Sequence, residues 1–229
     1  KEFPGATIEE IPVIVADKRR KEFAEFIDKN YPAEKVKEIL GLFSNRSNDK
    51  LIKDIVSPDA TVPTIYEYVV GIAWYYFSGK RVDILSSYNL TLSANFEPLV
   101  HAGGGQGDIV IYEADKVIML EATLMNASSQ KRGEWEPVLR HSINLKVEEE
   151  TANTGREVTS FFIADSFIKL IFHHPVTDMF PPHLLIIKSK RMLIVILYTL
   201  HGKKCPVTDQ RQWQCFIHIF INAIIHRQI

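Results

Sequence analysis

The pattern of hydrophobic and polar positions is clearest in residues 103–124. Two short apolar runs, at 109–112 and 117–120, flank a polar turn at 113–116. Strand, turn and strand in this order predict an antiparallel hairpin. A turn of two residues and a turn of four residues have the same centre, so both give the same pairing of the two strands.

Helical spacing of apolar residues marks the segments on either side of this hairpin. The predicted helices are 18–30, 32–43, 63–78 and 136–150. Pro63 begins the third of them, which is apolar nearly all round. A strand at 159–164 follows the last helix and should run parallel to the second hairpin strand, because a helix joins the two. The remaining segments are expected to be irregular: an extended lead-in at 1–16, turns at 44–59 and a loop or edge segment at 80–95.

Two carboxylates face each other in the predicted hairpin. Counting outward from the turn places Asp108 opposite Glu121, and like charges in such a pair are destabilising. A divalent cation between them would remove the repulsion, since Mg²⁺ prefers oxygen ligands. Thr123 points to the same face as Glu121. The alternative is an exposed hairpin with both acids in water, but Glu121 ends an apolar strand, where a carboxylate needs a partner.

A third carboxylate, Glu67, is the only charged residue of the apolar helix at 63–78. Such a residue usually has a partner, and the hairpin acids are the candidates. The alternative is that Glu67 lies in the first turn because the helix dipole favours an acid there.

The glycine-rich segment 103–107 precedes a strand, whereas phosphate-binding loops follow a strand and open a helix. It is therefore interpreted as a flexible entry to the hairpin, whose backbone could approach a substrate closely.

Composition limits the number of domains and the location. A chain of 229 residues, 46% hydrophobic, can bury one core and at most a small second unit. It begins with Lys1 rather than Met, which predicts a fragment or a processed chain. No signal peptide and no run of 18 apolar residues is present, so no membrane span is expected. Cys205 and Cys215 lack metal-site spacing, and a cytoplasmic location is the default.

Charge is distributed unevenly along the chain. The total is −1, but residues 168–229 carry +6, which leaves −7 for residues 1–167. A basic stripe for nucleic-acid binding is therefore excluded from the part with the candidate acids. Residues 168–229 also lack Glu and hold six of the eight His. This break in composition predicts a frame-shifted or otherwise non-native tail, and His173 and His174 within it are interpreted as incidental.

Asp108, a gap of twelve residues and then Glu121-Ala122-Thr123 resemble the PD-(D/E)XK nuclease superfamily. The longer string LEATLMNASSQKRGEWEPVLRH, at 120–141, more narrowly resembles the type IIS restriction endonucleases of the AlwI group and their nicking relatives. The resemblance covers about residues 60–167 and includes FIAD at 162–165.

The resemblance implies an α/β fold with a PD-(D/E)XK restriction-endonuclease-like core, a mixed sheet flanked by helices, and a helical N-terminal lead-in. It divides the chain into a lead-in or linker at 1–57, a catalytic core at 58–167 and the atypical segment at 168–229. The implied site residues are Glu67, Asp108, Glu121, Glu134 and His141, of which Asp108, Glu121 and Glu134 would be metal ligands. Thr123 stands where the superfamily usually has Lys, so the general base is unassigned; Glu134 or a second metal ion could replace it.

The implied function is Mg²⁺-dependent endonuclease cleavage of double-stranded DNA by the catalytic portion of a type IIS restriction or nicking enzyme. The sequence-recognition region is expected to be missing from this chain, and a second nuclease subunit or a dimer is a possible partner. One alternative is an inactive nuclease-fold module for DNA binding or subunit interaction. Another is a repair-type nuclease outside restriction.

Overall fold

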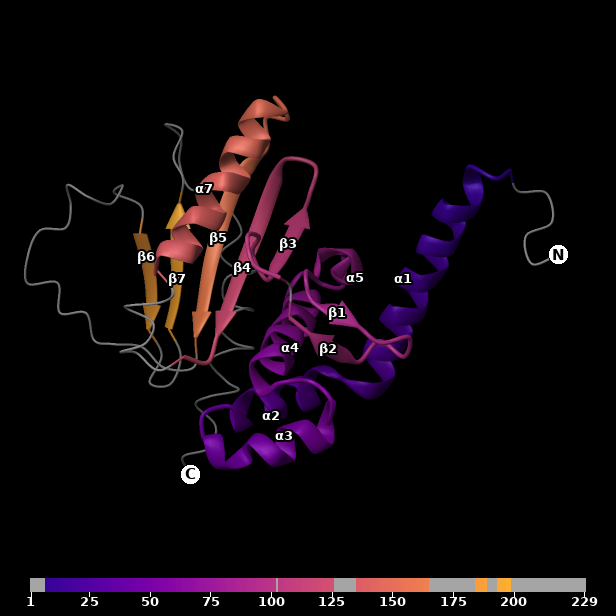
Figure 1. The fold of residues 1–229 in the computed structure, drawn as a ribbon, viewed down its shortest axis with the longest axis vertical. Helices are drawn as coiled ribbons and strands as arrows, with labels where there is room; N and C mark the ends of the chain where they lie inside the picture. The colour runs from indigo at the N-terminus through magenta and orange to yellow at the C-terminus, as the bar shows by residue number, and fades with distance from the viewer. Residues whose placement is uncertain (1–6, 102, 126–134, 165–183, 189–192, 199–229) are drawn as a thin grey trace, which may run out of the picture.

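A computed structural model describes residues 7–101, 103–125, 135–164, 184–188 and 193–198 (Figure 1). Within these residues the helices are α1 (Glu10–Asn30), α2 (Ala33–Leu42), the 3₁₀ turn η1 (Arg46–Asn48), α3 (Asp49–Ile55), α4 (Val62–Phe77), α5 (Ile84–Ser87) and α7 (Trp135–Thr151). The strands are β1 (Thr91–Leu92), β2 (Pro98–Val100), β3 (Ile109–Tyr112), β4 (Lys116–Thr123), β5 (Glu157–Ala164), β6 (Leu184–Lys188) and β7 (Leu193–Tyr198).

A mixed sheet in the order β3-β4-β5-β7-β6 forms the centre of the fold. β3 and β4 pair antiparallel with Tyr112 opposite Val117, which confirms the predicted hairpin and its register. β4 and β5 run parallel over their whole length, as the helix between them predicts. The chain therefore has a mixed α/β fold.

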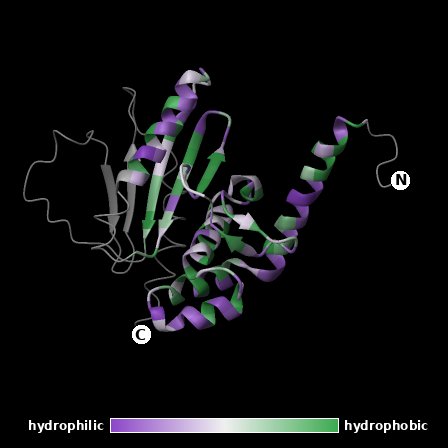
Figure 2. Ribbon diagram, viewed as in Figure 1, coloured by the Kyte–Doolittle hydropathy of each residue, from purple (hydrophilic) through white to green (hydrophobic). Residues whose placement is uncertain are grey.

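Helices cover both faces of this sheet, α7 on one and α4 on the other (Figure 1). Alternate residues of the strands supply the two faces. Ile109, Ile118 and Leu120 pack into the larger core with α4, whereas Val117 and Met119 pack beside α7. Figure 2 shows this contrast, with hydrophobic residues along the central strands and α4 and a mixed surface on α7.

Helix α4 is built as its sequence predicts. The hydroxyl of Thr61 caps its N-terminus by accepting a hydrogen bond from the Thr64 N–H at 3.3 Å, and Pro63 fits the first turn. Gly71 is needed in the middle of this helix, because a Cβ there would lie 2.4 Å from the ring of Tyr88. α4 thus contributes to the larger hydrophobic core, and the ring of Tyr88 packs against it at Gly71.

Before α4, the helix α2 matches the helix predicted at 32–43, whereas other segments differ from the expected ones. α1 begins at Glu10 rather than near residue 18, and Pro12 is accommodated because first-turn N–H groups have no partner within the helix. α3 and α5, with the short strand β1, lie in segments expected to be irregular. Such short elements depend on tertiary contacts more than on local propensity. Ile52 of α3, for example, is fully buried.

The predicted boundary near residue 57 crosses a continuous core. Phe23, Ile39 and Ile52, from α1, α2 and α3, belong to the same buried cluster as Ile65 and Ile72 of α4. The division into a lead-in and a catalytic core stays a prediction. None of the helices in the described part of the chain has the length and apolar character that a membrane span requires.

Most of residues 168–229 lie outside the described residues. Two stretches of this segment are described, as strands β6 and β7, and β7 pairs antiparallel with β5 from Thr159 to Ala164. The interpretation of this segment as non-native stays a prediction.

Truncation tests that interpretation. A chain ending at residue 199 should melt like the full chain, because it retains β7. A chain ending at Phe167 should be less stable, since β5 would lose its antiparallel partner and present an open edge. Thermal melting by circular dichroism and limited proteolysis compare the three chains. Equal stability of the shortest chain would instead support a non-native tail.

Candidate functional site

The candidate site lies where the start of β3, the end of β4 and the helix α7 meet. Ile109 pairs with Leu120, so the next position outward sets Asp108 opposite Glu121, as the sequence predicts. Asp108 comes one residue before β3 and is half-buried, whereas Glu121 is buried within β4. The strand register thus brings together two carboxylates that are separated by twelve residues in the chain.

The carboxylate of Asp108 is fixed against the neighbouring strand. Its Oδ2 accepts a hydrogen bond from the backbone N–H of Ala122 at 2.8 Å. Hydrogen bonds to an ionised acceptor are stronger than those between neutral groups. Asp108 therefore has a defined orientation next to Glu121.

Glu121 is joined to His141 of α7. The Nδ1 of His141 lies 2.7 Å from the Oε1 of Glu121, and only about a tenth of each side chain is exposed. When the Glu121 carboxylate is ionised it only accepts hydrogen bonds, and Nδ1 of His141 then carries the proton and donates. The resemblance implied that His141 belongs to the site, and the structure gives it a direct contact with Glu121.

A buried hydrogen bond holds α7 against the sheet beside this contact. The hydroxyls of Ser142 in α7 and Ser160 in β5 lie 2.7 Å apart. Leu145 packs one turn further along against Val117 and Val158. These contacts place His141 by fixing the helix that carries it.

Gly107 approaches the site very closely. A Cβ at this position would lie 2.5 Å from the Cγ of Met119 and 3.3 Å from the Oε1 of Glu121. The sequence predicted that the glycine segment lets backbone approach a substrate. At Gly107 the backbone lies close to side chains of the same protein, while a Cβ at Gly103, Gly104 or Gly105 would meet no atom within 4 Å, and the approach to a substrate stays a prediction.

We expect Gly107→Ala to lower the free energy of unfolding by about 1–3 kcal/mol, the usual cost of overpacking. The added methyl must displace Met119, which is 1% exposed and has little room to move. Chemical denaturation measures the change. Gly104→Ala is the control, because it adds the same methyl in open space. If both variants are equally stable, Gly107 is not a packing constraint.

The other predicted residues are placed differently. Glu67 is 8% exposed on α4, the helix that covers the opposite face of the sheet from α7. Thr123, which stands where a Lys was expected, accepts a hydrogen bond from the Met125 N–H at 3.1 Å through its hydroxyl. Glu134 lies outside the described residues. The structure therefore joins Asp108, Glu121 and His141, and it leaves the roles of Glu67 and Glu134 as predictions.

Comparison with known proteins identifies the family. The model of the AlwI restriction endonuclease family matches residues 4–199. The chain belongs to the AlwI restriction endonuclease family. Among solved structures, it is similar to the small subunit of the heterodimeric restriction endonuclease R.BspD6I, with 20% identity and a TM-score of 0.39. That match covers 53% of this chain and 58% of the subunit, so the chain spans little more than half of the subunit's length. No curated protein matches.

The acids of this AlwI-family chain suit a hard cation. Among the described residues, no group of three or more His, Cys, Asp and Glu is arranged to hold a metal ion. Mg²⁺ is commonly bound by one or two carboxylates together with water and substrate phosphates. Asp108 and Glu121 offer such a pair of carboxylates, so this donor set is of the kind that Mg²⁺ prefers.

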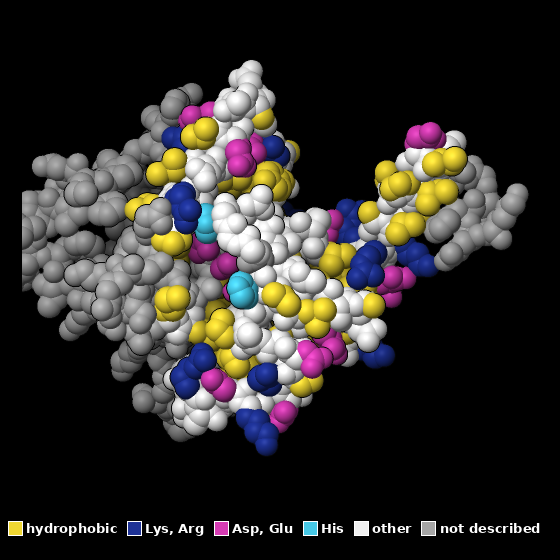
Figure 3. All heavy atoms as spheres, in the orientation of Figure 1, with side chains coloured by type: hydrophobic (Ala, Val, Ile, Leu, Met, Phe, Trp, Pro, Cys, Tyr) yellow, Lys and Arg dark blue, Asp and Glu magenta, His cyan; other side chains and the backbone are white. Residues whose placement is uncertain are grey.

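The face of the molecule that Figure 3 shows is mixed in charge. In Figure 3, acidic and histidine side chains appear together near the centre of the visible face, and Lys and Arg side chains lie mostly toward its edges. Such a distribution differs from the continuous basic stripe of an autonomous DNA-binding domain.

One residue near the site carried no signal in the sequence. Asn89 lies in the segment expected to be a loop or an edge, and it hydrogen-bonds to the backbone next to Asp108. No local pattern reveals such a contact, because the two segments are 18 residues apart.

Proposed function

We propose that the chain is a Mg²⁺-dependent DNA endonuclease with a PD-(D/E)XK core, and that it is the catalytic portion of a type IIS restriction or nicking enzyme. Membership of the AlwI restriction endonuclease family supports the reaction class. The observation that carries the proposal is the opposition of Asp108 and Glu121 at the end of the hairpin, with His141 bound to Glu121.

Asp108 and Glu121 would hold the cation, with Glu134 as a third ligand. Bound Mg²⁺ would supply an acidic water and stabilise the negative charge that develops on the phosphate. His141 orients Glu121 by donating to it, and the Ala122 N–H orients Asp108. A ligand whose orientation is fixed by such contacts needs less reorganisation when metal and substrate bind.

The remaining acids would act around this pair. Glu67 is proposed as the acid contributed by the helix before the core. Thr123 cannot act as the Lys of related enzymes does, since a hydroxyl carries no positive charge. The attacking water would then be oriented by Glu134 or by a second Mg²⁺.

The proposed substrate is double-stranded DNA. Residues 1–167 carry a net charge of −7, whereas affinity for the DNA backbone depends on cations. Sequence recognition and cleavage of the second strand would therefore require another region, a second nuclease subunit or a dimer.

Incubation with supercoiled plasmid tests the proposal. Mg²⁺ or Mn²⁺ should convert the plasmid to nicked or linear DNA, and Ca²⁺ or EDTA should not. Run-off sequencing of the product then separates a restriction enzyme, which cuts at fixed sites, from a repair-type nuclease with scattered cuts. A folded protein that leaves plasmid intact with every metal would instead be an inactive nuclease-fold module.

A further inference from the structure

We propose that Asn89 is a positioning residue that holds Asp108 opposite Glu121. The inference rests on the proposed role of Asp108 as a metal ligand. It adds a residue that lies outside both hairpin strands and that neither the family match nor the sequence pattern assigns.

Two hydrogen bonds connect Asn89 to consecutive residues at the start of the hairpin. The backbone N–H of Asn89 donates to the carbonyl oxygen of Asp108 at 3.0 Å. Its side-chain Nδ2 donates to the carbonyl oxygen of Gly107 at 2.5 Å. The peptide groups before and after the Cα of Asp108 are both held, so the direction of its Cα–Cβ bond is restrained.

The chain before Asp108 cannot supply this restraint itself. Four of the five residues at 103–107 are glycine, and Gly103, Gly104 and Gly105 are exposed. Glycine has more backbone freedom than any other residue, and ordering it costs the most conformational entropy. β3 is also the first strand of the sheet, with β4 alone beside it among the described strands. A contact from outside the hairpin therefore adds to the restraint on its first residues, beside the hydrogen bond from Ala122 to Asp108.

Asn89 can provide it because the preceding residue is firmly anchored. Tyr88 forms an isolated antiparallel bridge with Ile109, and its hydroxyl donates to the carbonyl oxygen of Tyr68 in α4 at 2.5 Å. Burial raises the pKa of the Tyr88 phenol well above its ordinary value, so the phenol keeps the proton that it donates. The ring packs against Gly71. Asn89 is thus attached to the core helix of the molecule.

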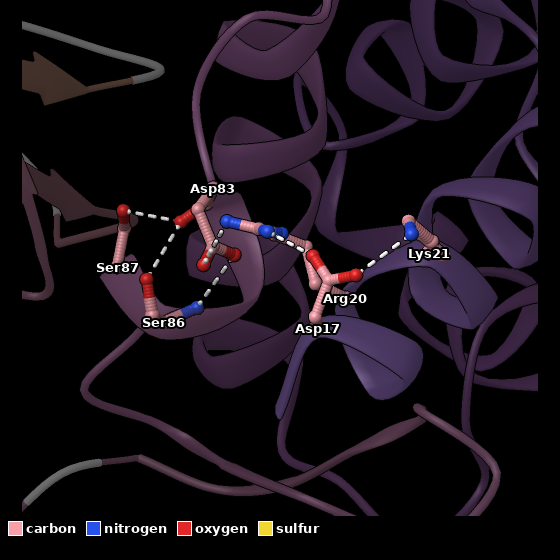
Figure 4. Close-up of polar contacts among 6 residues, drawn as sticks. All are labelled: Asp17, Arg20, Lys21, Asp83, Ser86 and Ser87. Atoms are coloured by element: carbon pink, nitrogen blue, oxygen red, sulfur yellow. Dashed lines mark hydrogen bonds and ion pairs between the residues drawn. The ribbon is translucent and has the colours of Figure 1, made fainter. Parts of the chain in front are cut away.

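The helix just before Tyr88 is anchored as well (Figure 4). Asp83 caps α5 by accepting from the Ser86 N–H at 3.3 Å, and its carbonyl oxygen accepts from the Ser87 hydroxyl at 2.7 Å. Arg20 of α1 reaches the carboxylate of Asp83 at 3.8 Å and also binds Asp17. Restraints from α1 and α4 therefore converge on the segment that ends at Asn89.

The restraint continues through Asp108 into β4. With its backbone held by Asn89, the carboxylate of Asp108 reaches the N–H of Ala122, next to Glu121. The exchange rate of the Ala122 amide therefore reports whether Asp108 is in place, and it can be measured without a cleavage assay.

Asn89→Ala tests the inference by removing the side-chain amide that donates to Gly107. Asn89→Leu is a second variant, which also removes this amide but fills the space that alanine would leave empty. Without metal, exchange of the Ala122 amide, followed by NMR, should be about tenfold faster than in the wild type, relative to amides in the middle of β4. In cleavage assays, half-saturation should need about 10–100-fold more Mg²⁺, and the maximal rate should fall by less than that factor. Asn95→Ala, in an exposed turn, should change neither quantity.

Two results would overturn the inference. One is an unchanged exchange rate at Ala122 in both Asn89 variants when they are folded. The other is a lower maximal rate with an unchanged Mg²⁺ requirement. That result would mean that Asn89 supports folding and does not position the metal ligand. A wild-type protein that does not cleave DNA would defeat the proposed function alone, because exchange at Ala122 still reports whether Asn89 holds Asp108.

Discussion

Asp108→Asn should abolish Mg²⁺-dependent cleavage and leave the fold intact. Asparagine keeps an oxygen that can accept from the Ala122 N–H, but it removes the charge that holds the cation. Loss of one preorganised charged group in such a site commonly costs at least about 10²–10³ in rate, or roughly 2.7–4 kcal/mol. Glu121→Gln should act in the same way. Single-turnover cleavage of plasmid across a Mg²⁺ titration measures the loss.

The stability of these variants distinguishes a metal site from a structural pair. Without metal, removing one of two opposed carboxylates relieves repulsion, so the melting temperature should stay equal or rise. Asp115→Asn is the matched control, because it changes the same residue type in the exposed turn of the same hairpin. Wild-type cleavage rates in Asp108→Asn would mean that the catalytic site lies elsewhere. If both acid variants unfold without metal, Asp108 and Glu121 are needed for folding rather than for metal binding.

His141→Ala should slow cleavage by about 10²–10³ per folded molecule, because Glu121 would lose the donor that orients it. His141→Asn should restore part of the rate, since the asparagine amide can donate from nearly the same place as Nδ1. Rates are measured in single turnover and normalised to folded protein.

The competing interpretation makes His141 a core residue. In that case His141→Ala lowers the melting temperature, leaves the rate per folded molecule unchanged and gives no difference between the two substitutions. The buried hydrogen bond between Ser142 and Ser160 offers a comparison within α7: Ser142→Ala should loosen the helix without removing a group that touches Glu121.

The sequence predicted the parts of the structure that depend on local pattern. The hairpin register follows from the symmetry of its turn, and α4 follows from its cap, its proline and its apolar length. The opposition of Asp108 and Glu121 could therefore be predicted, whereas the place of His141 beside them was implied by the family resemblance. Parts held by contacts between distant residues could not be predicted in this way. α3 and α5 are too short for a periodic signal, and Asn89 reaches Gly107 only because Tyr88 is anchored on α4.

The hairpin has a further consequence for changes in chain length. An extra residue within 109–112 would shift the pairing and turn Asp108 to the other face of the sheet, or it would force a bulge. An extra residue in the exposed turn around Asp115 would lengthen the loop and leave both acids in place. The twelve residues between the two carboxylates therefore contain a part of fixed length and a part of adjustable length. A short peptide tag or a fluorescent label inserted at the turn should leave the geometry of the site unchanged.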